Sequence, residues 1–409
     1  MMIAQGRVFW TAIALACLAT GGVLSHCIER DVQVASVTLA GGTPVLKFLP
    51  AHAKAPPVVL LAHGVTASKE ALFRLGEALA AAGFACYAVD LPGHGQSPKP
   101  FYFSQAHNMQ TLEDVARAIG PVDIFAGHSM GGGAGMAAVR DGGLHPRLFI
   151  AIGCLPPLAE DLPPLFLLEG EYDEAILQHT RASGRWSIPL SPSQFEEVFP
   201  TAQLGARTDV RLALVSWCDH LLEPFHPGVV NAAVDAACAA VGKSPPAAPT
   251  RWLWRLAGMV IGWLGALGLM LQLPALPRRL MWLRGPLVSG IGVVTAILTM
   301  STWIGAMPAP RRILFQIAIM TLLWVMVIGA NRLRIPRWAY STPTAAAAIG
   351  CMVAGAYFLL LVTLIVMAML VAGTILAWIA TRRGTQRDGN LAMAVFVGYA
   401  IGLWLPLPF

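Results

Sequence analysis

Apolar residues follow two different patterns along this chain of 409 residues. Before residue 250 they form short runs rich in Val, Ile and Leu, and after it they form much longer runs. Short apolar runs of this kind indicate buried strands, and they lie at 57–62, 85–89, 122–126, 148–153, 164–168 and 210–217. Segment 68–82 has helical periodicity and ends at Gly83. Strands that alternate with helices predict a mostly parallel α/β sheet with helices on both faces.

The most informative polar segment is GHSMGG at 127–132, directly after one of these predicted strands. It has the pattern G-x-S-x-G. A serine hydroxyl is a weak nucleophile until a base takes its proton, and both the base and the substrate must reach it. A sharp strand-to-helix turn presents a serine in this way, and Gly127 and Gly131 leave room for the turn because they lack a Cβ. Ser129 is therefore the candidate nucleophile.

Two further motifs precede this serine, each at the end of its own predicted strand: HGVT at 63–66 and DLPGHGQS at 90–97. Together with GHSMGG they resemble the α/β-hydrolase superfamily, specifically its esterase-like and dienelactone-hydrolase-like members, over roughly residues 40–242. The resemblance implies the α/β-hydrolase fold and a serine hydrolase activity that needs no cofactor. The order of the three motifs is far more specific than any one of them.

The resemblance also implies that an acid and then a histidine follow Ser129 along the chain. Asp173 stands just past predicted strand 164–168, where this family has its acid. Glu171 and Glu174 in the same loop are alternatives.

His220 follows predicted strand 210–217 and is the candidate base, with His226 as the alternative. Asp219 is not expected to orient His220, because neighbouring side chains diverge. In the expected mechanism His220 deprotonates Ser129, while Asp173 holds the imidazole in the required tautomer.

An oxyanion also needs donors that are already in place. By resemblance these are the backbone N–H groups of Met130, after the nucleophile, and of Val65, after His63 and Gly64. We expect His63 to support loop geometry and His128 to have a packing role. Together with Gly127 and Gly131, these supporting residues complete the predicted site.

A large cap domain is not expected, because only about ten residues separate the predicted strand at 148–153 from the acid strand. The extra length lies between Asp173 and His220. It includes 187–193 with Trp186, Phe195 and Phe199. This insert forms either part of an acyl pocket or an ordinary helix and loop.

Charge divides the chain in two. Residues 1–250 contain 15 Lys and Arg against 21 Asp and Glu, whereas residues 251–409 contain 13 Arg, no Lys and one acid, Asp388. The net charges are thus −6 and +12. The arginines lie in short clusters between long apolar runs, so this basic excess indicates a membrane and not nucleic acid.

The long apolar runs are approximately 252–275, 286–307, 313–330, 344–380 and 391–406. A membrane span needs roughly 20 apolar residues, so we predict an all-α transmembrane domain. The run at 344–380 is either two short spans or one long helix, and it has no strong turn signal. Two spans agree better with the positive-inside rule, because they place nine clustered arginines inside and two outside, against six and five for a single span.

Residues 8–25 form a further apolar segment after Arg7, which we interpret as a retained signal anchor in preference to a cleaved signal peptide. This interpretation places the hydrolase domain on the extracytoplasmic side of the plasma (inner) membrane. The predicted domains are therefore an anchor at 1–27, the hydrolase at 28–242, a Pro/Ala linker at 243–250 and the membrane domain at 251–409.

The remaining features narrow the function further. The seven cysteines show no disulfide framework, no metal cluster is convincing, and Arg255 lies near a span end where it can snorkel to the interface. The expected function is hydrolysis of a carboxylic ester or thioester, with a small or lipid-like substrate and with membrane lipids as neighbours. Acyl transfer on the same triad and a non-catalytic ligand-binding or sensor protein are the alternatives. No oligomeric state is indicated.

Overall fold

The structure is a computed structural model in which ten stretches of the chain are described: residues 2–25, 31–39, 41–65, 67–101, 105–141, 143–154, 162–173, 209–220, 222–247 and 251–272. The chain divides into two compact units. One contains the region 28–249. The other contains helices α1 (Met2–Ser25) and α8 (Arg251–Gln272).

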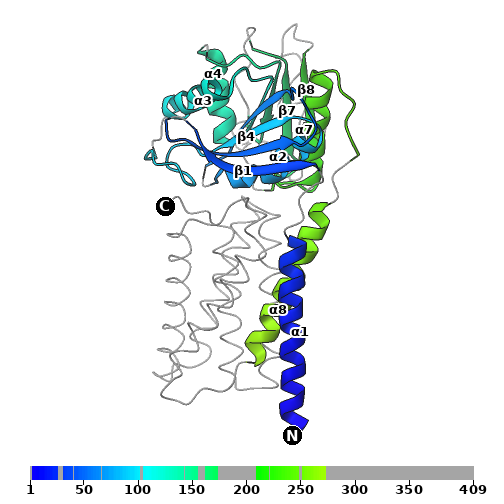
Figure 1. Ribbon diagram of the computed structural model, residues 1–409. Helices are drawn as coiled ribbons and strands as arrows, with labels where there is room; N and C mark the ends of the chain where they lie inside the picture. The colour runs from blue at the N-terminus through cyan, green and yellow to red at the C-terminus, as the bar shows by residue number, and fades with distance from the viewer. Residues whose placement is uncertain are drawn as a thin grey trace, which may run out of the picture. The chain divides into compact units, whose positions relative to one another are not determined.

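A single sheet forms the centre of the 28–249 unit (Figure 1). Within the described residues it has eight strands in the order β1-β2-β4-β3-β5-β6-β7-β8. The strands are β1 (Val32–Thr38), β2 (Pro44–Pro50), β3 (Val58–Ala62), β4 (Ala85–Val89), β5 (Ile124–His128), β6 (Leu148–Ile152), β7 (Leu165–Gly170) and β8 (Val210–Val215). Strand β2 runs antiparallel to both β1 and β4, and all the other pairings are parallel.

This sheet confirms the predicted α/β-hydrolase fold. The six strands expected from short apolar runs are all present, and only β5 lies two residues further along the chain than predicted. Strands β1 and β2 were not predicted. The edge strand β1 is only partly covered, so its sequence has no continuous apolar run to mark it.

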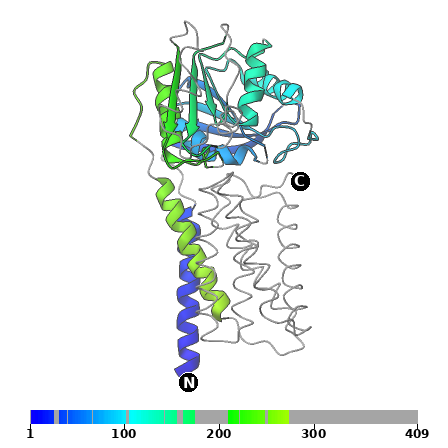
Figure 2. The ribbon, with the colours of Figure 1, turned by 180° about the vertical axis from the view of Figure 1, so that it is seen from behind.

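Helices cover both faces of the sheet, as Figures 1 and 2 show from opposite sides. Helices α2 (Phe73–Ala81) and α7 (Pro227–Ala240) lie on one face, and α3 (Gln105–Ile119) and α4 (Met130–Arg140) on the other. Alternate residues of one strand serve the two cores. In β3, Leu61 packs with the first pair of helices and Leu60 with the second.

This topology positions the site. Parallel strands place their carboxyl ends at one edge of a sheet, which is where open α/β sheets bind ligands. Ser129 follows β5, Asp173 lies three residues after β7, and His220 lies in the loop between β8 and α7. The three segments are far apart in sequence, but their strands are close neighbours in the sheet.

Helices α1 and α8 pack against one another through small residues. A Cβ on Gly21 would lie 2.5 Å from the Cα of Gly262, and one on Gly265 would lie 2.7 Å from the carbonyl oxygen of Ala14. Close packing of this kind brings two helix backbones together and buries Ala14 and Ala266.

No helix in the described part of the chain is both long enough and apolar enough to cross a membrane. The predicted spans at 8–25 and 252–275 coincide with α1 and α8 and are not supported as spans. The other predicted spans, at 286–307, 313–330, 344–380 and 391–406, lie outside the described residues.

Candidate active site

Ser129 occupies a strained turn between β5 and α4. Its φ and ψ are 52° and −119°, a backbone conformation that non-glycine residues rarely adopt. Its N–H donates to the carbonyl oxygen of Ile152 at 2.9 Å, which fixes the turn to the neighbouring strand β6. Strain held by surrounding structure is a common feature of functional sites. The half-buried side chain of Ser129 is thus presented at the carboxyl edge of the sheet.

Gly127 and Gly131 have the role expected from the motif, because neither position has room for a side chain. A Cβ on Gly127 would lie 2.6 Å from the Cα of Gly132. A Cβ on Gly131 would lie 2.4 Å from the carbonyl oxygen of Ala62. Both neighbours are backbone atoms, which do not move aside as a flexible side chain would. The two glycines therefore allow helix α4 to begin directly behind the serine.

The imidazole of His220 lies between Ser129 and Asp173. Its Nε2 is 2.9 Å from Ser129 Oγ, and its Nδ1 is 2.9 Å from Asp173 Oδ2. A carboxylate accepts hydrogen bonds, so Nδ1 carries the proton and Nε2 presents a lone pair to the serine hydroxyl. This is the arrangement in which a histidine can act as a general base toward serine. Asp173 is fully buried and His220 is largely covered.

The alternatives to these residues have other contacts. Glu171 Oε2 accepts from the N–H of Trp217 at 2.9 Å, and Asp219 Oδ1 accepts from the N–H of Leu222 at 2.9 Å. Glu174 lies outside the described residues.

His226, the alternative base, caps helix α7: its Nδ1 accepts from the N–H of Gly228 at 3.1 Å. Its side chain therefore serves the start of that helix, while His220 is the histidine that meets Ser129.

The two predicted oxyanion donors lie at the start of α4 and in the turn after β3. Met130 is the first residue of α4, where a backbone N–H has no partner within the helix. Val65 follows Gly64, and a Cβ on Gly64 would lie 3.1 Å from the Cβ of Ser129. The turn at 63–65 is thus close to the serine, and this proximity agrees with the expected place of Val65.

His63 holds this turn in place. Its Nδ1 donates to the carbonyl oxygen of Gly64 at 2.8 Å, and its Nε2 accepts from the N–H of Leu91 at 3.1 Å. The side chain is completely buried, and burial lowers the pKa of His63 to about 3. A neutral His63 can accept at Nε2, whereas an imidazolium could not. It therefore joins the loop after β3 to the loop after β4, which is the supporting role expected from the motif.

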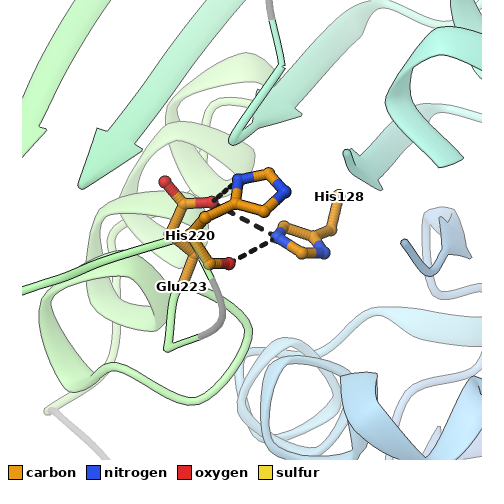
Figure 3. A group of neighbouring side chains, drawn as sticks. All are labelled: His128, His220 and Glu223. Atoms are coloured by element: carbon orange, nitrogen blue, oxygen red, sulfur yellow. Dashed lines mark hydrogen bonds and ion pairs between the residues drawn. The ribbon is translucent and has the colours of Figure 1, made fainter. Parts of the chain in front are cut away.

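His128 was expected to have only a packing role, but its side chain also makes polar contacts. Its Nε2 lies 2.9 Å from the backbone oxygen of His220 and 3.3 Å from Glu223 Oε2 (Figure 3). Because a carbonyl oxygen only accepts, Nε2 carries the proton. Burial lowers the pKa of His128 to about 3, so the ring is neutral. His128 thus connects the segment before the nucleophile to the loop that carries the base.

Two further carboxyl groups beside His220 and Asp173, those of Glu169 and Glu223, are fully buried and were not predicted as site residues. Burial, reinforced by the charge of Asp173, raises the pKa of both groups well above the usual range. Glu169 could have been noticed as an acid inside the otherwise apolar segment LFLLEG. Nothing in the sequence around Glu223 indicates that it is buried.

Two groups of side chains in the described residues could in principle hold a metal ion: His128 with His220 and Glu223, and Glu169 with Asp173 and Glu223. In the first group, Nδ1 of His220 is already hydrogen-bonded to Asp173 and Nε2 of His128 to a carbonyl oxygen. The second group is an all-carboxylate cluster in which burial holds two members neutral. Neither arrangement favours a cation over the hydrogen bonds present.

The five described cysteines, Cys17, Cys86, Cys154, Cys218 and Cys238, are free thiols. The insert at 187–193, with Trp186, Phe195 and Phe199, lies outside the described residues.

Residues 53–177 match the family described as "Serine aminopeptidase, S33". Among solved structures, the chain is similar to a protein from Thermus thermophilus, with 20% identity, 52% of this chain and 97% of that chain covered, and a TM-score of 0.37. It is also similar to an M. tuberculosis esterase, with 14% identity, 56% of this chain and 99% of that chain covered, and a TM-score of 0.39. A third similar structure is a Paleococcus ferrophilus monoacylglycerol lipase, with 17% identity, 51% of this chain and 99% of that chain covered, and a TM-score of 0.36. No curated protein sequence matches the chain.

The family match covers the segment that contains the HGVT, DLPGHGQS and GHSMGG motifs, and it ends just after Asp173. With the observed sheet, this match supports an α/β-hydrolase fold for the 28–249 unit and a serine hydrolase activity.

Proposed function

We propose that this protein is a membrane-bound serine hydrolase that cleaves carboxylic esters or thioesters through Ser129, His220 and Asp173. The observation that carries the proposal is the pair of 2.9 Å contacts made by the two ring nitrogens of His220, one to Ser129 Oγ and one to Asp173 Oδ2. The strained backbone of Ser129 and the complete burial of Asp173 support the same roles.

The first half of the reaction forms an acyl-enzyme. Ser129 Oγ attacks the carbonyl carbon of the substrate as its proton moves to His220 Nε2. The resulting imidazolium is stabilised by Asp173 through the Nδ1–H hydrogen bond. The backbone N–H groups of Met130 and Val65 stabilise the negative oxygen of the tetrahedral intermediate. The intermediate collapses, the carbon–oxygen or carbon–sulfur bond breaks, and Nε2–H protonates the leaving alcohol or thiol.

The second half restores the enzyme. A water molecule attacks the acyl-Ser129 ester while its proton moves to His220 Nε2. Collapse of the second tetrahedral intermediate releases the carboxylic acid and returns the proton to Ser129 Oγ. Proton transfers at Nε2 thus serve both halves, and Nδ1–H stays on the ring throughout.

Membrane attachment is the second part of the proposal. It is supported by the long apolar runs after residue 250 and by the 13 arginines, without a lysine, that lie in short clusters between them. Several large apolar side chains of α1 and α8 are also exposed, among them Phe9, Trp10, Trp254 and Leu264. Exposed apolar surface of this kind is typical of a surface that contacts lipid or another apolar protein segment.

The arginine pattern also underlies the proposed orientation, with the hydrolase domain on the extracytoplasmic side of the inner membrane. A membrane-impermeant maleimide tests it on intact cells that produce a Gln33→Cys variant, since Gln33 is exposed on β1. Labelling above the level of the native protein is expected without permeabilisation. Labelling that appears only after permeabilisation would reverse the orientation.

A fluorophosphonate probe tests the chemistry, because it reacts with activated serines. We expect labelling of the purified native protein and turnover of p-nitrophenyl esters, both lost in Ser129→Ala. An amino acid p-nitroanilide is the second substrate, since the matched family is described as an aminopeptidase. Labelling that survives Ser129→Ala would show a different nucleophile. Absence of both labelling and turnover in the native protein would favour a ligand-binding protein without catalysis.

A further inference from the structure

Glu223 lies three residues after His220, and its carboxyl group faces the imidazole ring (Figure 3). Its Oε2 is 3.6 Å from His220 Nδ1, the nitrogen that also binds Asp173. Its other oxygen, Oε1, accepts from the N–H of Gly170 at 2.8 Å, at the end of β7. One oxygen therefore anchors the side chain to the sheet, and the other lies beside the base.

The oxygen beside the base makes no hydrogen bond with any described residue, although the side chain is completely buried. Buried polar atoms are normally paired, so an unpaired one calls for an explanation. This oxygen lies 3.6 Å from His220 Nδ1 and 3.3 Å from His128 Nε2. Both nitrogens donate to other acceptors, namely Asp173 and the carbonyl oxygen of His220.

The backbone leaves space for this oxygen. Gly153, directly after β6, has a φ of 56°, and a Cβ at this position would lie 1.9 Å from Glu223 Oε2 and 2.9 Å from His220 Nδ1. Any other residue at 153 would therefore push the carboxyl group away from the ring. The fold thus holds a second carboxyl oxygen 3.6 Å from His220 Nδ1, slightly beyond the length of a hydrogen bond.

The groups that face Glu223 explain why it does not compete with Asp173. Glu169 and Asp173 come from β7 and the loop after it, and His128 comes from the end of β5. Cys218, Asp219 and His220 come from the loop that contains Glu223 itself. Burial raises the pKa of Glu223 well above the usual range, and the charge of Asp173 raises it further. A protonated carboxyl group is a weaker acceptor than a carboxylate, so the Nδ1–H group of His220 donates to Asp173 and not to Glu223.

We propose that Glu223 is a positioning residue for His220 and a reserve acid: when Asp173 is lost, its carboxylate moves to accept the Nδ1–H hydrogen bond and keeps the base in its catalytic tautomer. The inference depends on the proposed function, since it concerns the base of the same reaction. No additional bond is formed or broken, and the Nδ1 proton stays on the ring. The Glu223 carboxyl proton leaves to solvent when the group ionises.

Asp173→Ala tests the proposal, because it removes both the competing acid and its charge and opens space beside Nδ1. Replacement of the acid by an amide costs about 10⁴-fold in kcat in a serine protease triad, because the histidine then adopts the wrong tautomer. With Glu223 in reserve we expect Asp173→Ala to lower kcat by only about 10²- to 10³-fold. The double variant Asp173→Ala/Glu223→Gln loses about a further tenfold or more.

The matched control is Glu169→Gln in the same Asp173→Ala background. Glu169 has the same burial and belongs to the same carboxyl cluster, but it is not in the group that includes His220. We expect the residual activity to be unchanged by Glu169→Gln and lowered about tenfold or more by Glu223→Gln. A purely structural role for Glu223 would instead give the same fold loss from Glu223→Gln with Asp173 present and with Asp173 absent.

The pH profile gives a readout that packing alone would not change. The residual kcat of Asp173→Ala should continue to rise with pH as Glu223 ionises, and this rise should be absent in the double variant. A residual activity equal in the single and double variants would overturn the inference, as would a profile of Asp173→Ala without that rise. If the double variant does not fold, the profile of Asp173→Ala decides alone. An inactive native protein would instead contradict the proposed function.

Discussion

Lys69 and Asp90 form a completely buried ion pair, with 2.6 Å between Lys69 Nζ and Asp90 Oδ2. The same lysine lies 2.8 Å from Glu70 Oε1. Asp90 also accepts from two backbone N–H groups, those of Lys69 and Gln96, each at 2.8 Å. Together these contacts join the loop after β3, which contains HGVT, to the loop after β4, which contains DLPGHGQS. The ion pair therefore supports the turn that holds Val65.

Lys69→Met should lower the free energy of unfolding by about 3–5 kcal/mol, because it leaves the Asp90 carboxylate buried without its cation. The control is Lys99→Met. Lys99 is partly exposed and lies 3.7 Å from Asp114, so its loss should cost less than about 1 kcal/mol. Urea unfolding of the purified protein, followed by tryptophan fluorescence, measures both. Equal losses in the two variants would contradict the importance of the buried pair.

Gly131→Ala should both destabilise the protein and abolish esterase activity. The added Cβ would meet backbone oxygens of Ala62 and His63 at 2.4 and 2.6 Å, so helix α4 and Ser129 must shift. We expect a loss of about 1–3 kcal/mol, as for other overpacked sites. Gly133→Ala is the control in the same helix, because its Cβ would meet only the end of the Gln105 side chain, at 3.0 Å. That variant should fold and retain Ser129 labelling.

His220→Ala should lower kcat for p-nitrophenyl acetate by at least about 10⁴-fold, since it removes the base from Ser129. His226→Ala should instead cost about 1 kcal/mol of stability through loss of the helix cap, with kcat within about threefold of the native value. Steady-state kinetics and thermal unfolding of both variants separate the two roles. A large loss of kcat in His226→Ala, with His220→Ala active, would reverse the assignment of the base.

The buried neutral His63 predicts a particular pH dependence of stability. Its pKa is about 3 in the folded protein and about 6.5 when unfolded, so the unfolded chain binds the proton more readily. The stabilisation is therefore fully present above pH 6.5 and is lost as the pH falls toward 3. Within this window His63 contributes a slope of up to about 1.4 kcal/mol per pH unit.

Urea titrations between pH 3.5 and pH 7 of the native protein and of His63→Gln measure this slope. The difference between the two proteins isolates His63, because the other titrating groups cancel. Parallel pH dependences in the native and His63→Gln proteins would contradict the prediction.

The fold of the 28–249 unit was largely predictable, because parallel strands that are buried on both faces have continuous apolar sequences. The run 164–168 and the motif at 127–132 located β7 and the nucleophile turn directly. Strand β1 escaped prediction because an edge strand has no such run.

For the candidate acid, the sequence pointed to one loop and the resemblance favoured Asp173, but Glu171 and Glu174 stayed open as alternatives. Glu171 and Asp173 are two residues apart, and their difference depends on tertiary contacts. The N–H of Glu171 pairs with Val215 of β8, and its side chain turns to Trp217, which leaves Asp173 to meet His220. For Glu223, burial arises from contacts with Gly170 and Gly153, both distant in sequence.

Ser129 precedes His220, the histidine proposed to activate it, by 91 residues. Synthesis proceeds from the N-terminus at roughly 5–20 residues per second, so a ribosome makes the nucleophile about 5–20 s before its base. The last strand, β8, can join the sheet only along β7. A nascent chain therefore lacks the contact between Ser129 and His220 until this strand docks, and under the proposed function ester cleavage begins only after β8 has paired with β7.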